Sequence, residues 1–578
     1  MKSNKSTLTQ FIPLLGTFQS YRKEDLSGDV IAGITVAIML IPQGMAYALL
    51  AGMPPVYGLY ASIVPLLIYA LFGTSRQLAV GPVAMLSLLI VAGVGEFAEV
   101  GSDRFIHLAI MTALGVGAFQ FLMGIFRMGF LVNFLSHPVL SGFTSAAAII
   151  IGASQISNLL GLNLARSKQV HDIFIGAFQS IGNINLITAG IGVGSVVAII
   201  LFKKWKKTFP SALFVVVAGT AVTALFGLNG QGVSIVGNVP DGLPSFEVPG
   251  LSLSDYSSLL PIILVISLVS YMESIAVAKA IANKRGYKVD ANQELIALGG
   301  ANLGGAFFQS FPTTGGFSRT AVNDQSGART TIASVITAVL IGFTVLFLTP
   351  LFYYLPSAVL AAIIMVAVAG LFDAEEMIHL WKTDKRDLTM LSATFLATLF
   401  LGIEEGIGIG VLLSLVMVIY SSTQPHSTEV GKLGDTNNYR NVDRYPEAKT
   451  DPNILLYRFD SNLYFANVEN FRDTMEEKIH TRGDELSLVV IDASSIHSID
   501  STGVHALKEL IEELNERQIR FYLAGVIGPV RDKLKISGVT QAIGEENFFF
   551  DVAHAVSYYK DSEKFGPEHQ FSPLQTNN

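Results

Sequence analysis

The sequence contains no cysteine and only 2 tryptophans among its 578 residues. Without cysteine, the chain can form neither a disulfide framework nor a thiolate metal site. Charge is scarce too, because Asp, Glu, Lys and Arg make up 15% of the residues, whereas 51% are hydrophobic and the mean hydropathy is +0.49. This composition excludes an ordinary soluble globular protein and indicates a membrane protein.

Patterns that carry chemistry in enzymes are missing as well. No nucleophile is paired with a base, no metal-ligand spacing occurs, and the 10 histidines are scattered along the chain. We therefore expect that the protein is not an enzyme, that it needs no metal or other cofactor, and that it has no nucleic-acid partner.

Apolar windows of membrane-spanning length follow one another from residue 28 to residue 421. A bilayer core about 30 Å thick needs roughly 20 mainly apolar helical residues to cross it, so the windows predict a polytopic α-helical membrane protein with about 14 transmembrane segments. Residues 1–27 lack the apolar region and cleavage site of a secretory signal, and we expect them to remain as a cytoplasmic segment. The windows lie near residues 28–48, 56–72, 80–95, 107–127, 131–160, 184–202, 211–227, 256–282, 292–310, 317–327, 330–349, 355–371, 388–403 and 405–421.

The basic residues indicate how these segments are oriented. Lys and Arg in short loops favour the cytoplasm, and here they follow mainly the even-numbered segments, whereas the long loop 228–255 has neither. We therefore place both termini in the cytoplasm, in a multi-pass protein of the cell (plasma or inner) membrane. The basic residues after even-numbered segments are Arg76, Arg127, Lys203, Lys204, Lys206, Lys207, Lys284, Arg285, Arg329, Lys382, Lys385 and Arg386, and the exceptions are Arg104, Arg166 and Lys168.

Seven segments followed by seven more place the second half upside down relative to the first, which is the inverted-repeat plan of many secondary transporters. The two halves share a local feature. Gly81 and Pro82 open the short third segment, and Gly315 and Gly316 open the short tenth segment. Short, glycine-interrupted segments at corresponding positions predict a substrate site near the middle of the membrane.

Ser318 and Arg319 follow the glycines of the tenth segment. The first N–H groups of a helix have no intrahelical partners and its N-terminus is partially positive, so two such ends that face each other make an anion site. We expect Ser318 to be the N-cap and to donate its hydroxyl to an oxyanion, and Arg319 to add a permanent charge. The alternative is that Ser318 only caps the helix, while Arg319 pairs with a structural carboxylate or reaches toward the cytoplasmic side.

Glu273 is a carboxylate at membrane depth, about 16 Å along a helix from Lys284. Such a group can alternate between charged and neutral forms as an anion comes and goes. The alternative is a fixed salt bridge between Glu273 and Arg319 without proton transfer.

The first segment contains "IPQGMAYALL". Pro42 and Gly44 predict a break in the helix that presents Gln43 to the unwound chain or to a ligand, and Tyr47 lies one turn further on. Packing is the alternative role for Gln43 and Tyr47.

The chain turns polar after residue 421. Residues 422–452 read as a linker, and residues 453–560 alternate between strands and helices, which predicts an α/β domain with one mixed sheet. In that domain "ILLYRFDSNLYFAN" predicts a strand pair, and residues 500–503 open a helix, where N-capping is the simplest role. Residues 561–578 are expected to be disordered.

Several long stretches of the chain are distinctive in their order and spacing: "PPVYGLYASIVPLLIYALFGTSRQLAVGPVAMLSLL", "SHPVLSGFTSAAAIIIGASQI", "YMESIAVAKAIA", "GGFSRTAVNDQSGART" and, in the tail, "LVVIDASSIHSIDSTGVHALKEL". The first four resemble the sulfate permease (SulP, SLC26-type) family of anion transporters, and the last resembles the STAS domain that ends most of these proteins. The resemblance extends from about Asp25 to about Lys560. It implies two inverted seven-segment repeats, with a core domain (segments 1–4 and 8–11) that moves against a gate domain (segments 5–7 and 12–14), and a cytoplasmic STAS domain.

The resemblance also implies roles for single residues. Glu273 lies where proton-coupled plant sulfate transporters also have glutamate, whereas sodium-coupled bicarbonate members tend to have aspartate. Ser501 matches a serine that is phosphorylated in related anti-sigma-factor antagonists, so it is a candidate regulatory site. The substrate would contact Gln43, Tyr47, Val83, Ala84 and Ser318, with Arg319 as charge partner.

These features together predict a secondary active transporter of inorganic anions. We expect proton-coupled sulfate symport by an alternating-access, elevator-like mechanism, in a protein that forms homodimers as its relatives commonly do. The alternatives are sodium-coupled bicarbonate transport, chloride/bicarbonate transport, a passive anion channel, and an anion sensor that signals to the tail.

Overall fold

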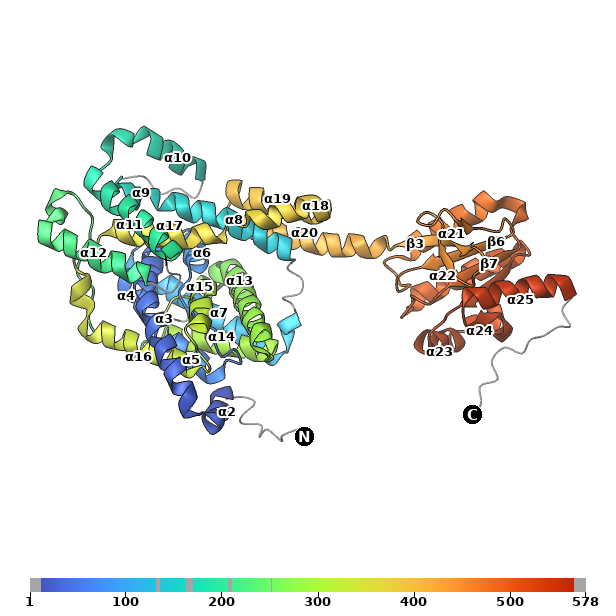
Figure 1. Cartoon of the computed structure of the whole chain (residues 1–578), viewed down its shortest axis with the longest axis horizontal. Helices are drawn as coiled ribbons and strands as arrows, with labels where there is room; N and C mark the ends of the chain where they lie inside the picture. The colour runs from blue at the N-terminus through green and yellow to red at the C-terminus, as the bar shows by residue number, and fades with distance from the viewer. Residues whose placement is uncertain (1–11, 131–135, 163–169, 206–209, 251, 566–578) are drawn as a thin grey trace. The chain divides into compact units, whose positions relative to one another are not determined.

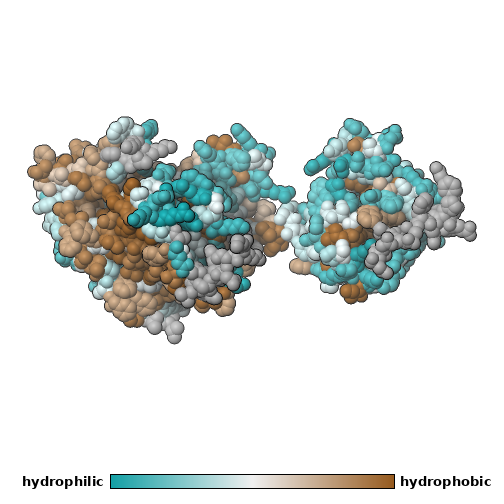
Figure 2. Space-filling model, turned by 60° about the horizontal axis from the view of Figure 1, so that its bottom comes forward, coloured by the Kyte–Doolittle hydropathy of each residue, from teal (hydrophilic) through white to brown (hydrophobic). Residues whose placement is uncertain are grey.

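The computed structural model divides the chain into two units, residues 1–414 and residues 415–578 (Figure 1). The structure describes residues 12–130, 136–162, 170–205, 210–250 and 252–565. The first unit is almost entirely helical and the second is an α/β domain. Figure 2 shows that hydrophobic residues cover much of the visible surface of the first unit, whereas the second unit is mainly hydrophilic.

Each apolar window of the sequence contains a helix, and a short break divides the second and the fifth windows into two helices each. Seven of the described helical segments are long and apolar enough to cross a membrane, and several shorter apolar helices accompany them. The helices of the windows are α3 (Lys23–Leu50), α4 (Pro55–Tyr60), α5 (Val64–Phe72), α6 (Ala84–Val94), α7 (Asp103–Ile125), α8 (His137–Ser154), α9 (Ile156–Leu160), α11 (Leu186–Trp205), α12 (Ser211–Phe226), α13 (Leu253–Arg285), α14 (Ala291–Ala306), α15 (Phe317–Gln325), α16 (Ile332–Phe347), α17 (Ser357–Val368), α19 (Lys385–Phe400) and α20 (Ile403–Thr423).

Two expectations about helix boundaries need correction. Pro42 does not break the first segment, because α3 continues through it. Gly44 and Gly58 instead let α3 and α4 approach closely, since a Cβ on Gly44 would lie 2.9 Å from the Gly58 carbonyl oxygen and a Cβ on Gly58 would lie 1.9 Å from the Gly44 carbonyl oxygen. Three short helices lie outside the predicted windows, namely α2 (Pro13–Ser20), α10 (Val170–Gln179) and α18 (Ala374–Thr383).

A buried carboxylate fixes the chain that leads from α5 toward the third segment. Glu294 of α14 is fully buried and accepts hydrogen bonds from the Tyr69 hydroxyl (2.7 Å), from the Thr74 amide and hydroxyl (2.7 and 2.6 Å) and from the Ser75 amide (3.0 Å). Four donors compensate the charge for the loss of water. The end of the second segment is thereby held against the ninth.

Helices α7 and α14 pack closely because each has a glycine where the two backbones meet. A Cβ on Gly299 would lie 2.4 Å from the Phe121 amide nitrogen, and a Cβ on Gly117 would lie 2.4 Å from the Leu303 amide nitrogen. Small residues let membrane helices approach at backbone distance. This contact brings the polar side chains of α7 and α14 close enough to support the central strands described below.

The second unit is built on one mixed sheet, as expected, in the order β4–β3–β6–β7–β8–β9. Strands β6, β7, β8 and β9 run parallel to one another, and β3 is antiparallel to β6. The strands are β3 (Ser427–Leu433), β4 (Tyr439–Asn441), β5 (Ala448–Lys449), β6 (Ile454–Phe459), β7 (Leu488–Asp492), β8 (Arg520–Ala524) and β9 (Phe548–Phe549), and the helices are α21 (Val468–Arg482), α22 (Ser501–Glu516), α23 (Gly528–Ile536), α24 (Val539–Ile543) and α25 (Val552–Phe565).

Three boundaries of this unit differ from the prediction. Much of the expected linker 422–452 is part of the sheet, because β3, β4 and β5 occupy it. Strands β4 and β5 both pair with β3 and form this edge of the sheet, which their polar sequence suits. The stretch expected as a strand pair holds only β6, followed by an isolated bridge between Leu463 and Ile499. Helix α25 continues to Phe565, so residues 561–565 are helical, and the rest of the expected disordered tail lies outside the described residues.

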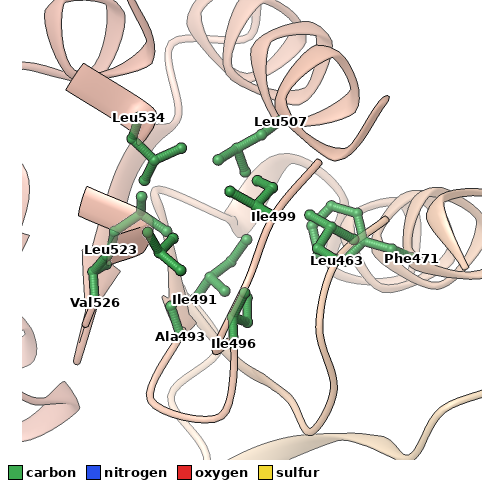
Figure 3. Close-up of a pocket in the computed structure, with 11 residues that line it drawn as sticks. Leu463, Phe471, Ile491, Ala493, Ile496, Ile499, Leu507, Leu523, Val526 and Leu534 are labelled. Atoms are coloured by element: carbon green, nitrogen blue, oxygen red, sulfur yellow. The ribbon is translucent and has the colours of Figure 1, made fainter. Parts of the chain in front are cut away.

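The core of the second unit encloses a cavity of about 20 Å³ (Figure 3). Only apolar side chains line it, among them Phe471, Ile491 and Leu523. A water molecule there would have no polar partner, so the cavity is a gap in packing and not a ligand site.

The glycine contact between α7 and α14 predicts a measurable difference between two substitutions. Gly299→Ala places a methyl group against backbone atoms and is expected to destabilise the membrane unit by about 1–3 kcal/mol, as overpacking does. Gly190→Ala in α11 is the matched control, because a Cβ there meets nothing within 4 Å. Thermal unfolding of the purified protein in detergent should show a lower Tm for Gly299→Ala alone. An equal Tm for both variants would contradict the packing described here.

Candidate functional site

A short antiparallel ladder joins the third and tenth segments. Strand β1 (Val80–Gly81) pairs with β2 (Thr314–Gly315), with Val80 opposite Gly315 and Gly81 opposite Thr314. The ladder continues in the bond from the Gly316 amide to the Ala79 carbonyl (3.1 Å). All these residues are buried, so the two sequence halves meet at an unwound, dry centre.

Each strand leads directly into a short helix. Helix α6 begins at Ala84 with Val83 as its N-cap, and α15 begins at Phe317 with Gly316 as its N-cap. Because the strands are antiparallel, the helices start at opposite ends of the ladder, and their free N–H groups flank the same centre. This arrangement provides two partial positive charges for an anion.

Ser318 is not the N-cap that the sequence led us to expect. It is the second residue of α15, because Gly316 adopts an extended conformation and its carbonyl accepts the first bond of the helix, from the Thr320 amide (3.0 Å). Ser318 is exposed, so its hydroxyl and its amide both remain at an accessible helix end.

Arg319 lies at the centre of this arrangement and is only 2% exposed. Its Nη1 donates to the carbonyl of Pro82 (2.7 Å), which joins the tenth segment to the third. Its Nε and Nη2 are buried and have no hydrogen-bond partner among the described residues. Arg319 therefore neither pairs with a structural carboxylate nor reaches out of the membrane, and it holds unused donors beside two helix ends.

Gly316 makes room for the guanidinium. A Cβ on Gly316 would lie 2.7 Å from Nη2 and 2.8 Å from Cζ of Arg319, whereas a Cβ on Gly81 would lie at an ordinary contact distance of 3.6 Å from Nη2. Gly316 has a φ of −86°, which other residues adopt readily, so contact with Arg319 is the reason for glycine at this position.

Glu273 of α13 lies near Arg319 without pairing with it. The two side chains, together with Tyr47, are close enough to interact electrostatically. Nevertheless, Glu273 and Arg319 form no ion pair among the described residues, and Oε2 of the half-buried Glu273 is buried without a hydrogen-bond partner. The structure therefore does not contain the fixed salt bridge that was the alternative role for Glu273.

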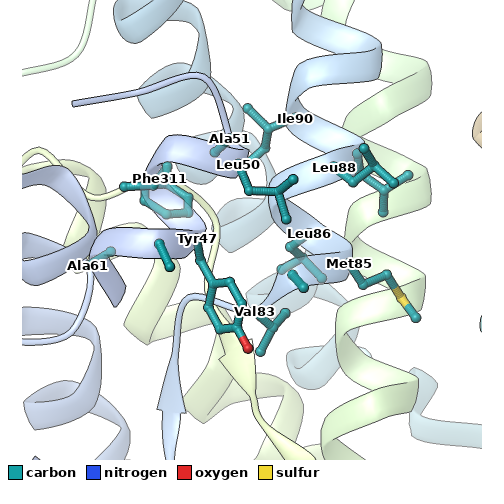
Figure 4. Close-up of a cluster of buried hydrophobic side chains, with 14 of the residues drawn as sticks. Tyr47, Leu50, Ala51, Ala61, Val83, Met85, Leu86, Leu88, Ile90 and Phe311 are labelled. Atoms are coloured by element: carbon teal, nitrogen blue, oxygen red, sulfur yellow. The ribbon is translucent and has the colours of Figure 1, made fainter. Parts of the chain in front are cut away.

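The other expected contact residues lie on α3 and at the start of α6. Gln43 and Tyr47 are buried on α3, and Val83 and Ala84 are buried at the start of α6. Figure 4 shows the Tyr47 hydroxyl beside Val83. Tyr47, Val83 and Ala84 belong to the large hydrophobic cluster of the membrane unit, so they supply an apolar wall next to the polar centre.

A buried polar network that the sequence did not reveal holds β2 in place. The Asn302 side chain accepts a hydrogen bond from the Thr313 amide (2.8 Å) and donates to the Thr313 carbonyl (3.1 Å) and to Gln120 (3.3 Å). Ser274 accepts from the Gly315 amide (2.8 Å), next to Glu273 in the chain. Single polar residues in apolar windows were the only signal for this network, and such residues look alike whether they pack or position a site.

Ser501, the predicted regulatory residue of the second unit, is accessible to solvent. Asp500 is the N-cap of α22, because its Oδ1 accepts from the Gly503 amide (2.8 Å). Ser501 is the first residue of the helix and is exposed. The capping role therefore belongs to Asp500 and leaves the Ser501 hydroxyl at the surface.

Taken together, the centre of the membrane unit combines a buried cation with free donors, two helix N-termini, an exposed hydroxyl and a nearby carboxyl group. These groups can bind a small oxyanion through charge-assisted hydrogen bonds. The carboxyl group can add or remove a negative charge beside that anion.

Comparisons with known proteins agree with this chemistry. Residues 26–394 match the model of the sulfate permease family, and residues 445–555 match the STAS domain. The chain is 42% identical to sulfate transporter 4.1 (chloroplastic) of Arabidopsis thaliana, in an alignment that covers 94% of this chain and 82% of that protein. It is 34% identical to high affinity sulfate transporter 2 of Stylosanthes hamata, with coverages of 96% and 87%.

Solved structures share the fold. The murine Solute Carrier 26 family member A9 anion transporter in the inward-facing state matches with a TM-score of 0.88 at 26% identity, over 97% of this chain and 96% of that chain. The transmembrane domain of a cyanobacterium bicarbonate transporter, BicA, matches with a TM-score of 0.58 at 23% identity, over 68% of this chain and 97% of that chain.

The close contact between Gly316 and Arg319 generates a prediction about affinity. Gly316→Ala displaces the guanidinium and is expected to raise the KM for the anion about tenfold, which corresponds to roughly one charge-assisted hydrogen bond. The Tm should change little, since a flexible side-chain end can give way. Gly152→Ala in α8 is the control, because a Cβ there meets nothing within 4 Å. An unchanged KM in liposome uptake would contradict this placement of Arg319.

Proposed function

The chain belongs to the sulfate permease family, and from this premise we propose that it transports sulfate together with protons across a membrane. Anion transport follows from the family, and the names of the relatives in Arabidopsis thaliana and Stylosanthes hamata favour sulfate. The observation that carries the proposal is Arg319, which is buried among helix ends with two unused donors.

Sulfate fits the donors of the site. Its tetrahedral oxygens accept hydrogen bonds in several directions, and Nε and Nη2 of Arg319 are two donor nitrogens that carry three N–H groups and share a full positive charge. The free amides at the starts of α6 and α15, and the Ser318 hydroxyl, supply further donors around the same centre. The buried site excludes most water, so each of these interactions is stronger than in solution.

Glu273 couples the anion to a proton in this proposal. An ionised Glu273 attracts Arg319 and repels an incoming dianion. Protonation of Glu273 removes this repulsion, and the Arg319 guanidinium is then free to bind the anion. Proton and sulfate therefore bind cooperatively, each raising the affinity for the other. The absence of a Glu273–Arg319 ion pair among the described residues supports a carboxyl group that can exchange its proton without first breaking a bond.

We propose further that the site moves as one body. Every contact that fixes it comes from the expected core segments: the β1–β2 ladder, the bond from Arg319 to Pro82, and the support from Asn302 and Ser274. A core that carries the complete site past the gate alternates access between the two sides of the membrane, as in an elevator. This mechanism requires no rearrangement of the donors between the outward and the inward states.

Other parts of the proposal rest on the sequence. The positive-inside pattern supports cytoplasmic termini and a position in the cell membrane, although one relative is named chloroplastic. The homodimer remains a prediction, as does phosphorylation of the exposed Ser501. Sodium-coupled bicarbonate transport, chloride/bicarbonate transport and passive conduction are distinguished from symport by the experiment that follows.

Glu273→Gln is expected to abolish the dependence of sulfate uptake on a proton gradient, because the amide cannot exchange a proton. Purified protein in liposomes is given labelled sulfate with an inward proton gradient, an inward sodium gradient, or neither. The wild type should accumulate sulfate only with the proton gradient, and the variant should show neither stimulation nor accumulation. Normal pH-dependent accumulation by Glu273→Gln would exclude the coupling role. Stimulation by sodium would make sodium the coupling ion, uptake without accumulation would favour passive conduction, and no uptake of sulfate would favour the bicarbonate alternatives.

Arg319→Ala is expected to raise the KM for sulfate by about 10- to 100-fold, the equivalent of roughly 1.5–3 kcal/mol for a hydrogen bond to a charged group. Arg319→Lys should recover only part of this loss, since an ammonium cannot reproduce the planar fork of donors. Arg329→Lys is the matched control, because Arg329 is exposed and pairs with Asp25 outside the site. A normal affinity for sulfate in Arg319→Ala would show that the anion does not bind at Arg319.

A further inference from the structure

Helix α18 has one apolar side that the protein leaves uncovered. Trp381 is 72% exposed and Ile378 is 58% exposed, whereas Leu380, on the edge of the same side, is buried. At about 100° per residue, Glu375, His379 and Lys382 lie on the opposite side, and all three are exposed. The helix therefore separates apolar and polar side chains cleanly and buries only one edge of its apolar side.

Helix α10 has the same place in the other half of the chain. It lies between the fifth and sixth segments, as α18 lies between the twelfth and thirteenth, and both helices have 10 residues. Its apolar side is again only partly covered: Ile173 is buried, while Phe174 is 51% exposed and Phe178 is 77% exposed. The inverted repeat thus produces one such helix on each side of the membrane.

Neither helix alone is long enough to cross the bilayer. Ten helical residues extend about 15 Å, which is half of the roughly 30 Å hydrocarbon core. Helix α18 begins shortly after α17 ends and is followed directly by α19, which it packs beside (Figure 1). Short connections to two apolar segments keep α18 at the membrane surface, where an uncovered tryptophan side chain favours the boundary between head groups and acyl chains.

We propose that α10 and α18 lie in the two lipid–water interfaces, with Phe174 and Phe178 of α10 and Ile378 and Trp381 of α18 inserted among the lipids. The basic residues Lys382, Lys385 and Arg386 at and after the end of α18 are exposed, which suits the anionic head groups of a cytoplasmic leaflet. Both helices belong to the expected gate domain. The lipids therefore hold the gate from both surfaces, while the site described above belongs to the core.

The tryptophan content of the chain allows a direct test on α18. The 2 tryptophans are Trp205 and Trp381, so Trp205→Phe leaves Trp381 as the only one. The full-length variant is placed in phosphatidylcholine/phosphatidylglycerol liposomes whose lipids carry bromine either near the head group or near the chain ends. We expect blue-shifted emission that shallow bromines quench more than deep ones, because an interfacial helix inserts about 5–10 Å below the surface.

A matched variant places the reporter on the polar side of the same helix. In a chain with Trp205→Phe and Trp381→Phe, His379→Trp should emit at long wavelength and resist quenching by either lipid. The same comparison on α10 uses Phe178→Trp, with Gln179→Trp as its control, since both positions are exposed.

Three results would overturn the proposal. Long-wavelength emission of Trp381 without lipid quenching places α18 in water. Blue-shifted emission without lipid quenching places it against protein, such as the second unit or a second copy of the chain. Stronger quenching by the deep bromines places it in the hydrocarbon core. None of these fluorescence measurements depends on the transported anion. The interfacial placement of α10 and α18 can therefore be confirmed or refuted independently of the proposed function.

Discussion

The membrane unit is organised around a buried arginine that has no carboxylate partner. A charge removed from water must be compensated by hydrogen bonds or by an opposite charge, yet Arg319 satisfies only Nη1, on the Pro82 carbonyl, and leaves Nε and Nη2 unused. The residues around Arg319 accommodate its side chain. Gly316 provides the space, and the β1–β2 ladder fixes the carbonyl that Arg319 contacts. In the proposed function, the transported anion supplies the missing compensation each time it binds.

The pattern of apolar windows predicted the helices well, because membrane helices must satisfy their backbone internally and need a fixed apolar length. Features shorter than a window were less predictable. Gly316 rather than Ser318 became the N-cap, since the strand before it determines where α15 begins. Pro42 stayed within α3 because neighbouring helices tolerate a freed carbonyl in a membrane protein.

The candidate site was predicted in part for similar reasons. Two adjacent glycines followed by an arginine in an apolar region were visible in the sequence, and the structure places them together. Asn302 and Gln120 were not visible, because a lone amide in an apolar window gives no sign of the segment that it contacts 11 or more residues away. Helices α10 and α18 were also missed, since they fall between the windows and expose the side that a soluble protein would bury.

The proposed separation of roles between core and gate rests on where the polar groups lie. The hydrogen bonds that hold the proposed anion site connect expected core segments to one another. Among the described residues of the expected gate segments, two short helices instead expose aromatic side chains. If the gate is held in both interfaces, the membrane supplies the fixed reference against which the core can slide. In the proposed symport, coupling depends on the charges inside the core. With Glu273 ionised and no anion bound, the charges of Arg319 and Glu273 cancel. Sulfate then adds two negative charges and a proton on Glu273 removes one, so sulfate binds more favourably when Glu273 is protonated.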